Sequence, residues 1–378
     1  MNFDFSESEQ KFHRKIAQAL AGHEAPEKMG IESKAAVPEW ISRFHQLLAD
    51  VGYLKLGFKM QGQDDGDSLH LLAGQEILAV FSQSLYLTVE MSMRMFGSLV
   101  RLWGRPEQQA QLLPELQSGK ILGAVALSED ALNVSNDPLK TEGIRKDKVI
   151  RVSGKKSYVV NAPWADWIAV VGRMQNQTAI FLVDKRTKGL QVEVPLKPLG
   201  YEAAAIAGIQ LDACDIPADR VILPPEDKSA LASLRQWENF ILMGAGLGMM
   251  QAAYTAAKAY ANSHYTGGKP IIAYQEVAFK LAEMLTLYQT SQLLAYRAAW
   301  TMDKQPQEKD GLMLCAKVLC AESAEKVASM ALQVLSGQGY QHGNQAADAY
   351  ACAKYTQIAG TSMEIARVFI GDEALGYK

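Results

Sequence analysis

Glu238 is the acidic side chain whose place in the sequence best suits proton chemistry. It lies four residues before Leu242 and seven before Ala245 in a helical pattern, and so on the face that this helix would bury. Apolar surroundings raise the pKa of a carboxyl group toward neutral pH, which suits a general base. A glutamate in the first turn of a helix is also favoured by the helix dipole alone. The residue pattern leaves both interpretations open.

Two glycine clusters allow a close approach to another group. The cluster from Gly244 to Gly248 lies inside an apolar helical run, without the strand that precedes a dinucleotide-binding turn. This context favours close packing of two helices. The cluster from Gly337 to Tyr340 is typical of a helix end and turn, which would bring backbone N–H groups near a ligand.

The composition limits the classes of protein and partner. A chain of 378 residues is long enough for two or three domains with their own cores. The 38 Lys and Arg residues nearly balance the 41 Asp and Glu residues, for a net charge of −3. This balance speaks against nucleic acid or an anionic membrane as partner.

The cysteines, the N-terminus and the apolar runs bear on metal binding, cellular location and membrane insertion. The four cysteines lack the spacing of a metal site, so no metal is expected. The N-terminus carries acidic residues where a signal peptide needs a basic stretch, and we expect a cytoplasmic protein. The longest apolar run, Phe240 to Met250, is 11 residues long, short of the roughly 20 that span a bilayer. We therefore expect a buried helix there.

The periodicity divides the chain into three parts. Residues 1–120 show helical patterns, beginning with a capping box at Ser6 and Glu9. Residues 121–226 contain short β-branched runs of period two, which predict an antiparallel β domain. Long helical patterns return in residues 227–378. A strand block between two helical blocks predicts an α+β fold.

Six segments, in this order along the chain, resemble motifs of the acyl-CoA dehydrogenase family. They are Gly104–Gly119, Ala126–Glu129, Gly154–Tyr158, Leu211–Pro217, Gln333–Tyr340 and Ala359–Ser362. The resemblance spans nearly the whole chain. It implies an N-terminal helical domain, a middle β domain and a C-terminal four-helix bundle, with FAD between the last two. It also implies a homotetramer built as a dimer of dimers.

The resemblance also identifies the expected base. In this family a glutamate lies either before the late Gly-Thr motif or on the first helix of the C-terminal domain. Ala359 occupies the first place, and Glu238 occupies the second, as in the isovaleryl-CoA dehydrogenase type. Glu238 would take the α-proton of an acyl thioester while a hydride passes to flavin N5, and the Ala359 backbone N–H would bond the thioester carbonyl. Asn239 stands where an arginine is usual, so Glu238 is predicted to titrate high.

Further contacts follow from the resemblance alone. The substrate contacts would be Ser135 and Asn239. The FAD contacts would be Val125, Leu127, Ser128, Tyr158, Val160, His264, Thr266, Gln333, Gly337 and Thr361. Several depart from the family pattern: His264 replaces a pyrophosphate-binding arginine, and Tyr158-Val-Val160 replaces the Trp-Ile-Thr that covers the flavin.

Three functions are compatible with these residues. The first is oxidation of an acyl group carried by coenzyme A or a carrier protein, with electron-transfer flavoprotein as acceptor. The second is other flavin chemistry on the same fold, such as a monooxygenase or a reductase. The third is a non-catalytic protein that has lost the flavin, which the altered FAD residues favour.

Overall fold

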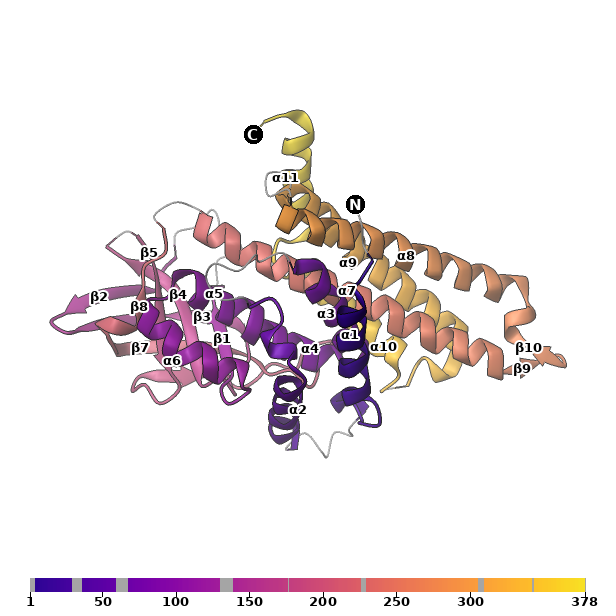
Figure 1. The fold of residues 1–378 in the computed structure, drawn as a ribbon, viewed down its shortest axis with the longest axis horizontal. Helices are drawn as coiled ribbons and strands as arrows, with labels where there is room; N and C mark the ends of the chain where they lie inside the picture. The colour runs from indigo at the N-terminus through magenta and orange to yellow at the C-terminus, as the bar shows by residue number, and fades with distance from the viewer. Residues whose placement is uncertain are drawn as a thin grey trace.

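The computed structural model describes residues 4–28, 36–58, 67–129, 139–175, 177–225, 229–304, 309–341 and 343–377. A β domain lies at one end of the molecule, and long helices run away from it to a small hairpin at the opposite end (Figure 1). The order is helices, strands and helices, as the sequence predicts. The predicted domain boundaries after residues 120 and 226 stay predictions; the second falls among residues outside the described ranges.

The N-terminal part is helical and forms much of the main core. The capping box is confirmed: the Glu9 N–H donates to Ser6 Oγ at 3.3 Å, and the Ser6 N–H donates to Glu9 Oε2 at 2.6 Å. The helices are α1 (Glu7–Leu20), α2 (Val37–Val51), α3 (Ser68–Phe81), α4 (Gln83–Glu90), the π-helix η4 (Met91–Gly97), α5 (Ser98–Trp103) and α6 (Pro106–Gln117).

The middle part is a single sheet of eight strands with its own apolar cluster. The strands are β1 (Gly123–Ala126), β2 (Glu142–Lys146), β3 (Val149–Val160), β4 (Trp167–Met174), β5 (Gln177–Asp184), β6 (Leu190–Val192), β7 (Ile206–Pro217) and β8 (Val221–Ile222). Their order is β6-β7-β3-β2-β4-β5-β8, and β1 pairs with β4. The sheet is largely antiparallel, as predicted, but β1 runs parallel to β4, which a short strand pattern cannot reveal.

The C-terminal part is a helical bundle built around one long helix. Its elements are α7 (Ser229–Ser263), the hairpin β9 (Tyr265–Thr266) and β10 (Lys269–Pro270), α8 (Gln275–Lys304), α9 (Lys309–Leu335), α10 (Gln345–Ile358) and α11 (Met363–Leu375). Helix α7 packs against α3, α8, α9 and α10. By length and composition it could cross a membrane, but 78% of its apolar window is buried inside the protein.

The first glycine cluster serves helix packing, as its context predicts. A Cβ on Gly248 would lie 2.3 Å from Cβ of Ala79 on α3, and one on Gly244 would lie 2.6 Å from the Tyr86 hydroxyl. A Cβ on Gly246 would lie 3.0 Å from the Cys320 carbonyl oxygen on α9. These close approaches explain why α7 carries no side chains at the three positions.

Candidate active site

Glu238 lines a pocket where the three parts of the chain meet. Its walls come from the π-helix η4, from β1 and the residues after it, from β3, from α7 and from α10. The pocket is open to solvent, and the space in and in front of it amounts to about 480 Å³. The lining residues are Met91, Met95, Val125, Leu127, Ser128, Ser157, Tyr158, Val160, Glu238 and Tyr355. Five of the predicted FAD contacts therefore share one pocket with the predicted base.

Opposing effects act on the pKa of the Glu238 carboxyl group. Burial raises its pKa above the ordinary value, because the charged form loses water. The positive charges of Arg235 and Lys317 and a hydrogen bond from the Gly360 backbone act in the other direction, and burial outweighs them. The raised pKa of Glu238 agrees in direction with the prediction from the sequence. A carboxyl group of this kind suits a general base near neutral pH.

Side chains from α7 and α9 form hydrogen bonds with the turn that follows α10. Asn239 is 3% exposed, and its amide both accepts from the Thr361 N–H and donates to the Thr361 hydroxyl, each at 2.9 Å. Arg235 donates to the Gly360 carbonyl at 3.0 Å, and Lys317 donates to the Thr361 carbonyl at 2.7 Å. Asn239 thus bonds within the protein through Oδ1 and one N–H of its amide, and its predicted contact with substrate stays a prediction.

The opposite wall presents an aromatic ring on a strained backbone. Tyr158 is 68% exposed and has φ of +56°, a region that costs a non-glycine residue about 1 kcal/mol or more. It stands at an irregularity of β3, where the pairing with β7 shifts between Lys156 and Val159. Beside it, the Ser157 N–H donates to the Ser128 carbonyl at 2.9 Å. An exposed ring beside the segment of Leu127 and Ser128 fits a planar, partly polar ligand such as a flavin ring.

The segment after β1 is held by a buried ion pair. Lys156, 0% exposed, donates to Glu129 at 2.7 Å and to the Leu127 carbonyl at 3.0 Å. Glu129 also accepts from the Lys140 N–H and from both the N–H and the hydroxyl of Thr141. The segment of Leu127 and Ser128 is therefore fixed from beneath. We find no signal in the sequence that predicts this pair.

Comparison with known proteins agrees with this arrangement. The model of the acyl-CoA dehydrogenase middle domain matches residues 124–214, and the model of the C-terminal domain matches residues 232–375. The chain belongs to the acyl-CoA dehydrogenase family. Members of this family bind FAD and are oxidoreductases that act on CH–CH groups.

Individual relatives cover nearly the whole chain. Benzylmalonyl-CoA dehydrogenase of Aromatoleum aromaticum is 28% identical over 99% of both chains. The solved structure of butyryl-CoA dehydrogenase from Megasphaera elsdenii superposes with a TM-score of 0.89 at 21% identity, over 99% of this chain and all of the other. Glutaryl-CoA dehydrogenase of Mycobacterium smegmatis in complex with FADH2 superposes with a TM-score of 0.88 at 19% identity, over 98% and 95%. Both solved structures share the fold of this chain.

The backbone donor predicted at Ala359 is already in use. The Ala359 N–H donates to the Tyr355 carbonyl at 2.9 Å. Ala359 is the C-cap of α10, so its N–H completes the last helical turn and does not face the pocket as a free donor. The predicted contact of this N–H with a thioester carbonyl stays a prediction.

The remaining family positions lie outside the pocket. His264 and Thr266 are exposed at and beyond the end of α7, and Figure 1 shows their hairpin at the far end from the β domain. At about 1.5 Å per residue, the end of α7 lies roughly 38 Å from Glu238. Gln333 and Gly337 are exposed before the start of α10, at the end away from Tyr355. These four do not meet the pocket within one chain; Ser135 lies outside the described residues.

The second glycine cluster forms a helix end, as predicted, but with a different residue at the turn. Helix α9 ends at Leu335, and a short 3-10 turn follows from Ser336 to Gln338. The left-handed backbone conformation falls on Ser336, with φ of +53°. A Cβ on Gly337 would meet nothing within 4 Å. Gly337 therefore leaves its backbone open to a neighbour without itself making the turn.

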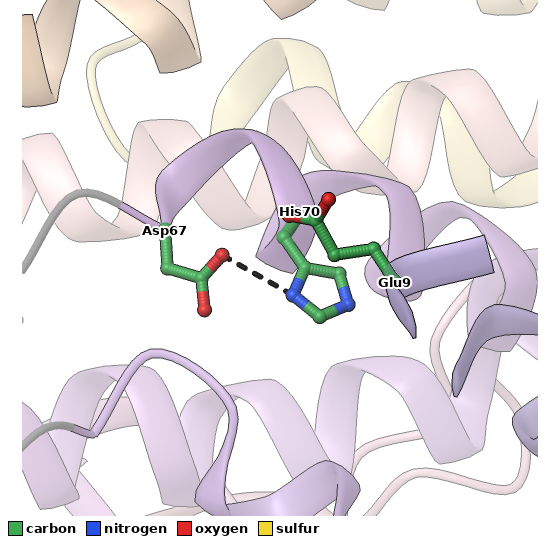
Figure 2. A group of neighbouring side chains, drawn as sticks. All are labelled: Glu9, Asp67 and His70. Atoms are coloured by element: carbon green, nitrogen blue, oxygen red, sulfur yellow. Dashed lines mark ion pairs between the residues drawn. The ribbon is translucent and has the colours of Figure 1, made fainter. Parts of the chain in front are cut away.

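One cluster away from the pocket has the composition of a cation site. Within the described ranges, Glu9, Asp67 and His70 place potential ligand atoms within 4.8 Å of one another (Figure 2). His70 Nδ1 lies 3.2 Å from Asp67 Oδ1, and Glu9 caps the start of α1. Both carboxylates thus have partners in the protein, and we assign no ion to this cluster.

Proposed function

We propose that this protein oxidises the acyl group of a coenzyme A thioester, with Glu238 as the base that removes the α-proton. The observation that carries the proposal is the shared pocket, in which the carboxyl group of Glu238 faces the positions where the family holds its flavin. The raised pKa of Glu238 adds support, because a base that titrates nearer neutral pH holds its proton more strongly.

The residues of the chain divide the reaction between them. Bound FAD would supply the redox chemistry by accepting the β-hydrogen as hydride. Leu127, Ser128 and Tyr158 would hold its ring in the pocket. Ionised Glu238 accepts the α-proton at a carboxylate oxygen, and the acyl group is left as an α,β-unsaturated thioester. The protonated Glu238 must then return its proton to solvent before the next turnover.

The apolar part of the pocket suits the acyl group. Met91 and Met95 lie one turn apart on the π-helix η4, and Tyr355 faces them from α10. Thioether side chains adapt their shape and contact aromatic rings favourably. An apolar acyl group placed there would exclude water from Glu238, which strengthens the interactions of its charge. We propose an apolar acyl group as substrate.

We further propose an assembly in which a second copy completes the cofactor site. His264, Thr266, Gln333 and Gly337 are exposed and do not meet the pocket of their own chain. A homotetramer built as a dimer of dimers would let them reach FAD bound to another copy. Electron-transfer flavoprotein as acceptor, which the family resemblance implies, and a cytoplasmic location are further parts of the proposal.

The visible spectrum tests this function. Purified protein reconstituted with FAD is mixed without oxygen with a branched or an aromatic acyl-CoA, and the flavin band is followed. Loss of the band in the wild type, but not in Glu238→Gln, is the expected result. A protein that takes up no FAD would favour the non-catalytic alternative. Substrate-dependent oxygen uptake with a hydroxylated product would favour a monooxygenase.

A further inference from the structure

Lys317 is a buried cation, and no carboxylate of the described residues lies at bonding distance from it. Its residue is 1% exposed on α9. Within the described residues, its Nζ donates to the Thr361 carbonyl at 2.7 Å and lies 3.9 Å from Met363 Sδ. Neither partner carries a charge. Because a buried charge without an opposite one is costly, this lysine calls for a physical reason.

The charges that act on Lys317 point to Glu238. Burial lowers the pKa of Lys317 to about 8, and the negative charges of Glu238 and Glu364 act in the opposite direction. Glu364 is exposed on α11, where water screens its effect. Glu238 is the acidic group of the pocket, and Lys317 in turn lowers its pKa. The two groups therefore favour each other's charged forms without touching.

The two groups are also linked through the turn after α10. Arg235 and Asn239 lie on either side of Glu238 on α7, and both bond the turn at Gly360 and Thr361. The Gly360 backbone bonds Glu238 itself. Lys317 bonds the same turn from α9. The base, the turn and Lys317 thus form one connected unit that spans three helices.

We propose that Lys317 is a positioning residue for Glu238, which fixes the Gly360–Thr361 turn against the base and supplies a buried positive charge that favours the ionised carboxylate. The inference rests on the proposed function, in which Glu238 accepts a proton. A base must be ionised to do so, and burial alone favours its neutral form. A nearby positive charge offsets part of that effect.

Of the other groups that face Glu238, Arg235 acts in the same direction as Lys317, and Tyr355 does not. Arg235 on α7 lowers the pKa of Glu238, and a guanidinium group is a permanent charge in proteins, so its effect is constant. Tyr355 on α10 has its pKa raised by burial and by the charge of Glu238, so it stays neutral. Lys317 is the cation among these three whose charge can change near neutral pH.

The test compares pH profiles of kcat/KM for the FAD-loaded wild type, Lys317→Gln and Lys317→Arg. The acid limb is the part of the profile in which kcat/KM falls at low pH as Glu238 becomes protonated. Lys317→Gln removes the positive charge, so we expect this limb at higher pH. Each pH unit of the shift lowers kcat/KM about tenfold at a pH below the limb. Lys317→Arg retains the charge and returns the limb toward its wild-type position. Lys326→Gln is the matched control, because it removes an exposed charge from the same helix, and its limb stays in place.

A second readout does not depend on turnover. Infrared titration follows the carboxyl band that Glu238→Gln removes, and this band titrates at higher pH in Lys317→Gln than in the wild type. An unmoved band and limb in a folded Lys317→Gln would overturn the inference. If Lys317→Gln does not fold, Lys317→Arg provides the test. An acid limb that moves to higher pH in Lys317→Arg, although the positive charge is retained, would overturn the inference. Wild-type activity in Glu238→Gln would overturn the proposed function instead.

Discussion

Asn239 holds Thr361 through both ends of its amide. Oδ1 accepts the Thr361 N–H and Nδ2 donates to the Thr361 hydroxyl, each at 2.9 Å, and both residues are 3% exposed. Asn239 follows Glu238 directly on α7. The residue next to the proposed base therefore anchors the turn whose backbone bonds that base.

Replacing Asn239 by aspartate tests this anchor. Aspartate is the same size but cannot donate to the Thr361 hydroxyl, and it would bury a negative charge beside Glu238. We expect a loss of roughly 1–3 kcal/mol in the free energy of unfolding, measured with urea. Asn262→Asp near the end of α7 is the control, because its amide is exposed, and it changes stability by less than about 0.5 kcal/mol. Equal losses in the two variants would contradict the anchor.

The buried pair of Lys156 and Glu129 makes a stronger prediction. Glu129→Gln leaves the ammonium of Lys156, 0% exposed, without its opposite charge. Breaking such a pair costs about 3–5 kcal/mol in the free energy of unfolding. Glu276→Gln removes the exposed partner of Lys280 and costs less than about 1 kcal/mol. If the two substitutions destabilise the protein equally, Glu129 does not have the structural role described.

Glu129 also predicts how stability depends on pH. Burial alone would raise the pKa of this carboxyl group, but hydrogen bonds from Lys156, Lys140 and Thr141 lower it to about 2, from an ordinary value of 4.5. A group whose pKa is lower in the folded state stabilises the protein above its unfolded pKa. This contribution is lost as the pH falls from about 4.5 toward 2. Urea titrations across this range should show a smaller pH dependence in Glu129→Gln than in the wild type.

Tyr158 predicts a separation of stability from flavin affinity. Glycine at this position relieves the positive φ, and the exposed ring contributes little packing, so Tyr158→Gly should not lower the melting temperature. The same change removes the aromatic ring from the pocket wall, and we expect weaker FAD binding, measured by the quenching of flavin fluorescence. Tyr158→Phe retains the ring and should bind FAD as the wild type does. Unchanged affinity in Tyr158→Gly would exclude a flavin contact at this residue.

The local features of the fold could be predicted because neighbouring residues determine them. The capping box at Ser6 and Glu9, the helical pattern of α7 and the close packing at Gly244 to Gly248 depend on spacing within one element. The parallel pairing of β1 with β4 depends on how distant segments meet, and no period in the sequence reports it.

The candidate site shows the same division. The position of Glu238 on a buried helical face and its raised pKa followed from the sequence. Asn239 and Thr361 are far apart in the chain, so their hydrogen bonds could not be foreseen. The use of the Ala359 N–H by Tyr355 depends on where α10 ends, and helix ends are the least certain part of such a prediction.

Exchange of the α-proton with solvent tests the central claim most directly, because it reports the base alone. The FAD-loaded protein is incubated without an electron acceptor in deuterated water with an acyl-CoA that bleaches its flavin, and deuterium at the α-carbon is measured by mass spectrometry. We predict rapid incorporation by the wild type, and in Glu238→Gln a rate lower by about 10²-fold or more. Incorporation at the wild-type rate by a folded, FAD-loaded Glu238→Gln would contradict the account.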